Sequence, residues 1–483
     1  MQLIRNYRSL IGLVIGGIIV VIFLLFPDNK ANLSFGILGA LVLFSIVFLF
    51  YKKWLLFITI AAIPISTGAI FPGTGMSVSM PSELLTGLLA MYVVVQLARN
   101  RIDSAILKHP VTILLFIDLC WMLVSTITSS APDVSMKRFL MRAVFFLVFY
   151  LVTVSYSKGS AISVLKLFLL YLFGLIPVMY FTFTRHMHYD FDLRAVFEIC
   201  APYYSDHTIY AACLAFVIPI CLVVIWNART FKLSVLFKSF LFLILVFLVS
   251  QELLALSRAA LISLGAAFVF YLFLKTKWKS YVLFAALGVV ITVGISMREE
   301  IYGNVQATEA VSNDGDVANH FSSVTNVKTD ASNLERINRW VCAFEMFKER
   351  PLTGFGPGTY QFEYGQFQTS EFKTYISTNH GDRGNAHSEY LTYLSEQGLP
   401  GMLIFICIVV YTVHLGIKNY HLTIDPKDKV ILLGILIGLI TFFVHGLVNS
   451  FLDQDKMAFL VYASLAVIVL FDLKNKRLEA SAA

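Results

Sequence analysis

Two arginines in separate parts of the chain have side chains suited to binding a phosphate group. Arg258 lies in the stretch LALSRAALISL, and Arg336 lies in a polar stretch four residues before Trp340. A guanidinium group holds phosphate oxygens through two parallel hydrogen bonds and keeps its charge at physiological pH. The small residues around Arg258 favour a packed helix face, although a snorkelling arginine among lipid headgroups is the competing interpretation. The residue types therefore predict an electrostatic role without requiring a metal.

His387 is the residue whose position best suits a general base. It is near the start of a predicted short helix, where the helix dipole lowers the pKa of an imidazole. A neutral imidazole can remove a proton from a hydroxyl group, and a histidine that merely lines a headgroup interface is the alternative. We therefore predict a catalytic set of His387, Arg336 and Arg258.

Five further residues are weaker candidates for contacting a diphosphate or an acceptor: Arg339, Arg383, Tyr204, His207 and Asp453. Glu335 precedes Arg339 by four residues, which is the spacing of a surface ion pair on a helix. We therefore prefer Arg336 to Arg339 as the functional arginine of this segment. Tyrosines near the ends of spans are also expected from membrane anchoring alone.

Composition indicates that these residues are carried by a membrane protein. Of 483 residues, 58% are hydrophobic and only 14% are charged, and the mean hydropathy is +0.76. A soluble chain of this length needs more surface charge. Apolar runs of near-spanning length predict fourteen membrane helices, at 10–26, 32–51, 54–67, 82–98, 110–130, 139–156, 162–184, 206–226, 236–252, 259–275, 280–297, 400–417, 429–449 and 457–472. The predicted fold class is an all-α polytopic membrane protein with about 12–14 transmembrane helices.

The distribution of basic residues predicts the orientation of these spans. The loops on the side of the two termini hold twenty Lys and Arg residues, and the short loops on the other side hold seven. Basic residues concentrate in cytoplasmic loops, so both termini are predicted to be cytoplasmic and the net charge of +7 to reflect topology rather than nucleic-acid binding. The chain then divides into an N-terminal bundle (1–297), a large extracytoplasmic loop (298–398) and C-terminal spans with a tail (399–483).

The large loop contains two segments with recognisable local signals. Residues 332–350 have apolar positions at steps of three and four, which predicts a helix. The stretch NAHSEYLTYLSEQGLPG (385–401) predicts a short re-entrant helix with Asn385 as N-cap, Gly398 after its last turn and Pro400 opening the next span.

The six cysteines show no metal-binding spacing, and only Cys200 and Cys342 are predicted outside the cytoplasm and the spans. A disulfide between these two residues is therefore left open.

Three segments in order resemble the O-antigen ligase/polymerase superfamily of bacterial membrane glycosyltransferases. They are SRAALISL (257–264), the stretch from Arg336 and Trp340 to ERPLTGFGPGTY (349–360), and AHSEYLTYLSEQGLPG (386–401). The resemblance extends over roughly residues 200–470. It departs from many members at Ser388, where they carry Asn after the histidine, and this puts in doubt a role for that neighbour.

The resemblance implies a GT-C-like fold and a glycan donor on undecaprenyl diphosphate, used on the periplasmic side of the inner membrane without a cofactor. It implies that His387 activates an acceptor hydroxyl while Arg258 and Arg336 hold the diphosphate. The favoured acceptor is lipid A-core, as in an O-antigen ligase acting in lipopolysaccharide assembly. A glycan polymerase and a protein O-oligosaccharyltransferase share these motifs. From a different class, a lipid-linked oligosaccharide flippase remains as an alternative, although it is expected to show internal repeats and charges at mid-membrane.

Overall fold

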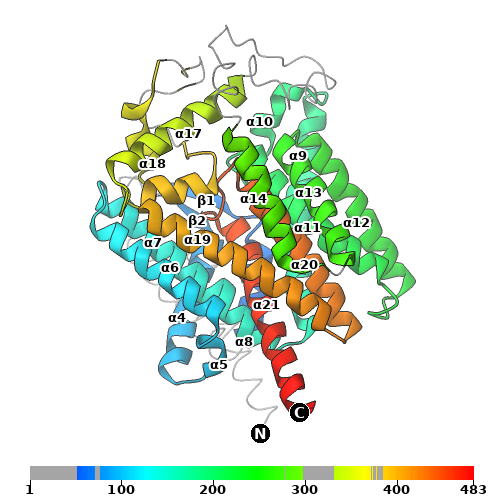
Figure 1. Ribbon diagram of the computed structural model, residues 1–483. Coiled ribbons are helices and arrows are strands. Elements are labelled where there is room, and N and C mark those ends of the chain that lie inside the picture. The colour runs from blue at the N-terminus through cyan, green and yellow to red at the C-terminus, as the bar shows by residue number, and fades with distance from the viewer. Residues whose placement is uncertain are drawn as a thin grey trace, which may run out of the picture.

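The computed structural model describes residues 52–70, 77–276, 278–296, 331–370, 373, 377 and 384–482, and these are almost entirely helical (Figure 1). The helices up to residue 296 are α3 (Lys52–Ala62), α4 (Ser82–Ala98), α5 (Ser104–Leu107), α6 (Pro110–Ile127), α7 (Pro132–Phe145), the π-helix η1 (Phe146–Val152), α8 (Thr153–Ser157), α9 (Ala161–His188), the 3-10 helix η2 (Leu193–Ala195), α10 (Val196–Ile199), α11 (His207–Trp226), α12 (Val235–Leu254), α13 (Arg258–Lys275) and α14 (Ser280–Ser296).

The remaining helices are α17 (Ala331–Glu349), α18 (Tyr360–Glu363), the 3-10 helix η3 (Tyr364–Phe367), α19 (Glu389–Leu422), α20 (Pro426–His445) and α21 (Asp455–Ala482). Two short strands, β1 (Thr67–Ile70) and β2 (Ser77–Met80), pair antiparallel with Thr67 opposite Met80.

The predicted class of all-α membrane protein is confirmed. Nine helices of the described part are long and apolar enough to cross a membrane, and three shorter apolar helices accompany them. Every predicted span from residue 54 onward overlaps one of these helices, but 54–67, 82–98 and 280–297 fall on the three shorter ones, and 54–67 runs past the end of α3 at Ala62. Spans 10–26 and 32–51 lie outside the described residues. The span predicted at 139–156 begins earlier, because α7, η1 and α8 form one continuous helix from Pro132 to Ser157.

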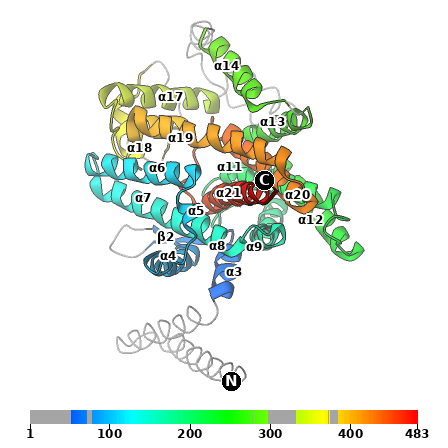
Figure 2. The same ribbon diagram turned by 60° about the horizontal axis from the view of Figure 1, so that its bottom comes forward.

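The centre of the bundle is built by α11, α20 and α21, which are almost wholly buried (Figure 2). Two glycines one turn apart let α20 approach α11 closely: a Cβ on Gly434 would lie 3.2 Å from the Cα of Ile220, and one on Gly438 would lie 2.9 Å from the carbonyl oxygen of Phe216. Small residues at such spacing allow backbones to pack without lipid between them.

Helix α19 is two helices joined by a kink at Gly398. This residue has φ 70° and ψ −172°, and a Cβ there would lie 2.1 Å from the carbonyl oxygen of Leu352. Pro400 follows inside the first turn of the second part. The prediction that Gly398 ends a short helix and that Pro400 opens the next span is therefore confirmed. The three-part division of the chain stays a prediction.

The two ends of the bundle are formed by different segments of the chain. Helices α20 and α21 are antiparallel neighbours, so the loop 446–454 lies at one end with the beginning of α19. Helices α17 and α18 cover this end, and the C-terminus of α21 lies at the other (Figure 1). The order of the chain therefore brings three distant segments together at the end that carries α17.

Cys200 and Cys342 are both buried free cysteines. Cys342 packs with Met346, Phe355 and Tyr360 beneath α17, whereas Cys200 belongs to the main core. The disulfide left open by the sequence is therefore not formed, because the two thiols lie in different hydrophobic clusters.

Candidate active site

His387 lies in a tight turn directly before α19. Its backbone has φ 44°, and its amide donates a hydrogen bond to Oδ1 of Asn385 (2.9 Å). The side chain of Ser388 caps the helix, because its Oγ accepts from the amide of Leu391 (3.4 Å). The prediction of Asn385 as N-cap is therefore wrong. Ser388 has the extended backbone (φ −163°) that turns a side chain toward the free amides of the first turn, and Asn385 shapes the turn before it.

The imidazole of His387 has one nitrogen committed to the protein. Its Nδ1 faces Oδ1 of Asn449 at 3.4 Å. An amide oxygen can only accept, so this contact places the proton on Nδ1 and leaves the lone pair on Nε2. A neutral imidazole in this tautomer has its basic nitrogen directed away from the asparagine. The arrangement is that of a general base whose orientation is held by a second residue.

The surroundings of His387 disfavour its protonated form. Burial of the ring, with the positive charges of Arg339 and Arg336, lowers the pKa of His387 to about 3, while the contact with Asn449 and the charge of Asp206 oppose this. The predicted direction of the shift is therefore right. The cause differs from the predicted one, because burial and two arginines lower the pKa of His387 where the dipole of a helix was expected to do so.

Arg339 connects α17 to the turn that carries His387. Its Nε donates to Oε1 of Glu335 (2.8 Å) and its Nη1 donates to the carbonyl oxygen of Asn385 (3.2 Å). Only 8% of the Arg339 side chain is exposed, so the expected ion pair with Glu335 exists but its predicted surface position is wrong. A Cβ on Gly384 would lie 1.6 Å from Nη1 of Arg339, so the chain passes this guanidinium without room for a side chain.

Trp340 fixes the same turn from the next position of α17. Its Nε1 donates to the carbonyl oxygen of His387 at 3.1 Å. Arg336 lies one turn earlier on this helix and is half-buried, close enough to His387 to act on its charge. The structure thus places Arg339 and Arg336 near His387, and the catalytic roles of His387 and Arg336 stay predictions.

The glycine-rich stretch 354–358 is a turn anchored beneath the re-entrant part of α19. Gly354, Gly356 and Gly358 have φ of 65°, 108° and 79°, values that other residues rarely adopt. The carboxylate of Glu396 accepts hydrogen bonds from the amides of Gly358 (2.8 Å) and Tyr360 (3.1 Å). Both donors are backbone amides of the turn, which indicates a structural role for Glu396.

Asp453 lies between two arginines of α7. Its carboxylate pairs with Nη1 of Arg138 (2.9 Å) and with Nη2 of Arg142 (2.7 Å), and Nη1 of Arg142 donates to Oη of Tyr393 (2.7 Å). Burial disfavours the charged carboxylate, but both guanidinium groups outweigh it and hold the pKa of Asp453 below its ordinary value. We call Asp453, Arg138, Arg142 and Tyr393 the arginine clasp, since they join α7, α19 and the loop 446–454.

Glu389 holds the loop 446–454 against the beginning of α19. Its Oε2 accepts from Oγ of Ser450 (3.1 Å) and from the amides of Phe451 (2.9 Å) and Leu452 (3.2 Å). Its own amide donates to the carbonyl oxygen of Gly446 (2.7 Å). Glu389 therefore fixes the loop that carries Asn449, and this loop places Asn449 beside His387.

The other predicted residues have different surroundings. Arg258 is the first residue of α13 and half-buried, at the same end of the bundle as His387. His207 opens α11 with its Nδ1 3.2 Å from Asp206 and its ring against Phe197. Tyr204 is buried, with its ring beneath the ammonium of Lys456 at 5.0 Å. Arg383 lies outside the described residues.

Three residues near this site were not found from the sequence. Asn449 orients His387, and its Nδ2 is buried without a hydrogen-bond partner among the described residues. His445, at the end of α20, is 1% exposed, has neither ring nitrogen bonded in the described part, and is within electrostatic reach of Arg336 and Asp206. Arg142 was overlooked. A polar residue at the end of an apolar run was the available signal for all three.

The described residues do not include a group of three His, Cys, Asp or Glu side chains arranged to hold a metal ion. The absence of a cofactor stays a prediction, and the residues gathered around His387 are suited to binding anions rather than cations.

Comparison with known proteins bears on the segment that carries this site. Residues 252–406 match the family model described as O-antigen ligase. The matched segment contains Arg258, Arg336 and His387, and the resemblance to the O-antigen ligase/polymerase superfamily is thereby confirmed. No curated protein matches the chain significantly. The match supports a membrane enzyme of the glycosyltransferase type.

Proposed function

We propose that this protein transfers a glycan from undecaprenyl diphosphate to a hydroxyl acceptor, with His387 as general base and Arg336 and Arg258 as ligands of the diphosphate. The reaction takes place on the periplasmic side of the inner membrane, and the favoured acceptor is lipid A-core. The observation that carries the proposal is a neutral His387 beside the arginines of α17, with no hydrogen bond to its Nε2 among the described residues, inside the segment that matches the O-antigen ligase family.

The proposed reaction is a single inverting displacement. The acceptor oxygen attacks the anomeric carbon and its proton passes to Nε2 of His387. The bond between that carbon and the phosphate oxygen breaks, and undecaprenyl diphosphate leaves with the electron pair. Arginine side chains stabilise the charge that grows on the leaving group, an effect worth several kcal/mol at a site with little water. No second carboxylate is needed, in contrast to a retaining glycosidase.

Donor binding is expected to make His387 a better base. The charges of Arg339 and Arg336 oppose protonation of the ring. A diphosphate bound to Arg336 would compensate the charge of that arginine, and the pKa of His387 would then rise toward the range in which a general base is most effective. The base would thus become active when the donor is in place, which limits unproductive proton transfer.

The acceptor distinguishes three activities with the same donor chemistry. A ligase uses lipid A-core, a polymerase uses a second lipid-linked glycan, and an oligosaccharyltransferase uses serine or threonine of a protein. None of the contacts around His387 is specific for one acceptor. A lipid-linked oligosaccharide flippase is the alternative from another class, and it has no need of a general base oriented by Asn449.

The test uses the purified protein, one undecaprenyl-diphosphate glycan, and either lipid A-core, no added acceptor, or an acceptor peptide. We expect product with lipid A-core, and a His387→Gln variant that transfers about 10²–10⁴-fold more slowly. His188→Gln is the matched control, because His188 is exposed at the end of α9. Growth of the glycan without added acceptor would indicate the polymerase instead.

Wild-type transfer by His387→Gln, with donor binding also unchanged, would contradict the assignment of the base. Absence of transfer to any acceptor by the wild-type protein, together with movement of the donor across vesicle membranes, would favour the flippase.

A further inference from the structure

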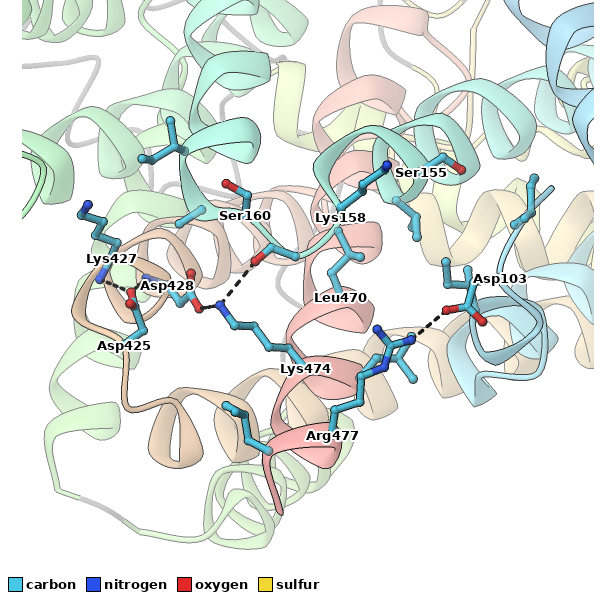
Figure 3. Close-up of a pocket in the computed structure, with 18 of the residues that line it drawn as sticks. Asp103, Ser155, Lys158, Ser160, Asp425, Lys427, Asp428, Leu470, Lys474 and Arg477 are labelled. Atoms are coloured by element: carbon cyan, nitrogen blue, oxygen red, sulfur yellow. Dashed lines mark hydrogen bonds and ion pairs between the residues drawn. The ribbon is translucent and has the colours of Figure 1, made fainter. Parts of the chain in front are cut away.

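A cavity of about 770 Å³ opens at the end of the bundle opposite His387 (Figure 3). It lies between the beginning of α5, the connection from α8 to α9, the beginning of α20 and the last turns of α21. Helix α20 begins at this cavity and ends at His445 beside the candidate active site. The cavity is therefore separated from that site by the length of a spanning helix.

The cavity has an excess of positive charge. Its basic residues are Arg101, Lys158, Lys427, Lys474 and Arg477, and its acidic residues are Asp103, Asp425 and Asp428. Two of the basic residues are neutralised, since Lys474 pairs with Asp428 (2.5 Å) and Arg477 pairs with Asp103 (2.7 Å). Within the described part of the chain, Arg101, Lys158 and Lys427 form no ion pair.

The remaining carboxylate does not balance these three charges. Asp425 caps α20, where its Oδ1 accepts from the amides of Lys427 (2.8 Å) and Asp428 (3.0 Å). One of its two carboxylate oxygens is thus engaged by the helix it caps, and its single negative charge against three positive charges leaves an excess of two. In Figure 3, Lys158 stands on the α8–α9 connection and Lys427 on the first turn of α20, so the cationic groups come from separate elements.

The same cavity has an apolar wall. Val154, Ile106, Leu470 and Leu473 line it among other aliphatic side chains. At its rim, Ile162 is 47% exposed and Leu478 is 53% exposed. Exposed aliphatic side chains beside lysines are suited to a ligand with a hydrocarbon part and an anionic part. A free phosphate or nucleotide would leave this wall unmatched.

We propose that the cavity binds the headgroup of an anionic phospholipid, such as phosphatidylglycerol. The headgroup occupies the cavity, where Arg101, Lys158 and Lys427 supply the positive charge, and the acyl chains leave along Ile162 and Leu478. Basic pockets between membrane helices are suited to binding anionic headgroups. The bound lipid would come from the surrounding leaflet. The bound lipid would connect the α8–α9 connection, α20 and α21, three of the elements that line the cavity.

The test measures lipid retention by native mass spectrometry of the full-length protein, extracted from vesicles of equal phosphatidylglycerol and phosphatidylcholine. We expect the wild type to retain phosphatidylglycerol preferentially. The triple variant R101Q/K158Q/K427Q should lose this preference by about tenfold or more, since three charges contribute to the attraction. The matched control is R229Q/K232Q/K238Q, which removes one arginine and two lysines from exposed positions near the α11–α12 connection at the same end.

A second arm adds inorganic phosphate or sn-glycerol 3-phosphate to the wild-type protein. Neither should displace the retained lipid at millimolar concentration if the apolar wall contributes. Three results would overturn the proposal: no lipid preference in the wild type, equal loss in the triple variant and its control, or displacement by phosphate alone. The first and third need no variant, so misfolding of the triple variant leaves the proposal open to refutation. The readout is independent of glycan transfer.

Discussion

At the scale of single residues, His387 depends on neighbours that are distant in the sequence. Arg339 and Arg336 act on its charge from α17, and Asn449 holds its Nδ1 from the loop after α20. Burial and both arginines favour the neutral ring. A depressed pKa means that the imidazole remains a proton acceptor well into the acidic range, so acid inactivation of transfer should occur only at low pH.

The pH dependence of transfer tests this environment. With a pKa of about 3 for His387, kcat/KM of the wild-type protein should stay level from about pH 8 to about pH 5. Arg336→Gln removes a positive charge that opposes protonation, so the pKa of His387 rises and the acid limb moves to higher pH. The variant should also transfer several-fold more slowly because it binds the diphosphate less well. The measurement is the profile of kcat/KM against pH.

Lys348→Gln provides the control for this experiment. Lys348 lies on the same helix as Arg336, but its side chain is 68% exposed and pairs with Glu345. Its removal should leave the acid limb unchanged. An acid limb that coincides in the wild type and in Arg336→Gln would show that the arginine does not act on the base.

These residue-scale features were only partly predictable. His387 and Arg336 were selected because their residue types suit the proposed chemistry, and the spacing of Glu335 and Arg339 correctly indicated an ion pair. The burial of that pair was missed because it depends on Gly384, which passes the guanidinium from another segment. Asn449 lies 62 positions from His387 in the chain, so no local pattern could connect the two.

At the scale of elements, the direction of α19 is set by Gly398. The re-entrant part of α19 positions His387, and the second part crosses the membrane. An alanine at position 398 would need a left-handed backbone and would place its Cβ 2.1 Å from the carbonyl oxygen of Leu352. We expect Gly398→Ala to destabilise the protein by more than about 1 kcal/mol and to reduce transfer, as seen in thermal unfolding and activity measured in detergent.

Gly265→Ala is the matched control for the kink. Gly265 is inside α13 and a Cβ there meets nothing within 4 Å, so the substitution should be neutral or stabilising by up to about 1 kcal/mol. If Gly398→Ala were as stable and active as this control, the kink would not position His387.

The arginine clasp makes a second prediction about elements. Asp453→Asn removes the charge that compensates Arg142, a residue only 3% exposed. Breaking a buried pair in this way is expected to cost about 3–5 kcal/mol of stability, measured by thermal unfolding. Glu345→Gln, which breaks the exposed pair with Lys348, should cost less than about 1 kcal/mol. A stable Asp453→Asn variant with a raised KM for the donor would instead support Asp453 as a substrate ligand.

The positions of helices and of the kink were predictable from the sequence where a single local property determined them. Apolar length located every span from residue 54 onward, and Gly398 with Pro400 located the kink. Asn385 was chosen as N-cap because several polar residues precede α19, and only the backbone angles select Ser388 among them. The arginine clasp was missed because Arg138 was counted as a loop residue, whereas α7 continues the span outward to Pro132.

At the scale of the whole molecule, we assign a different role to each end of the bundle: glycan transfer at one end and lipid binding at the other. The end with α17 holds His387, and the other end holds the cationic cavity and the C-terminal turns of α21. Basic residues favour the cytoplasmic side of a membrane, so the cavity should face the cytoplasm and His387 the periplasm. A lipid-linked donor on the periplasmic leaflet can reach His387 only in this orientation.

Labelling of single cysteines with a membrane-impermeant maleimide tests this orientation. Cys120 and Cys407, the exposed native cysteines of the described residues, are first replaced by serine. Gln366→Cys, exposed near α18, should then be labelled in intact spheroplasts. Ile424→Cys, at a position 88% exposed between α19 and α20, should be labelled only after the membrane is disrupted. Labelling of both after disruption is the internal control, because it shows that each thiol can react. The opposite pattern would place His387 in the cytoplasm, where it could not meet a donor already moved across the membrane, and the proposed transfer would then have to be abandoned even if the purified protein bound the glycan.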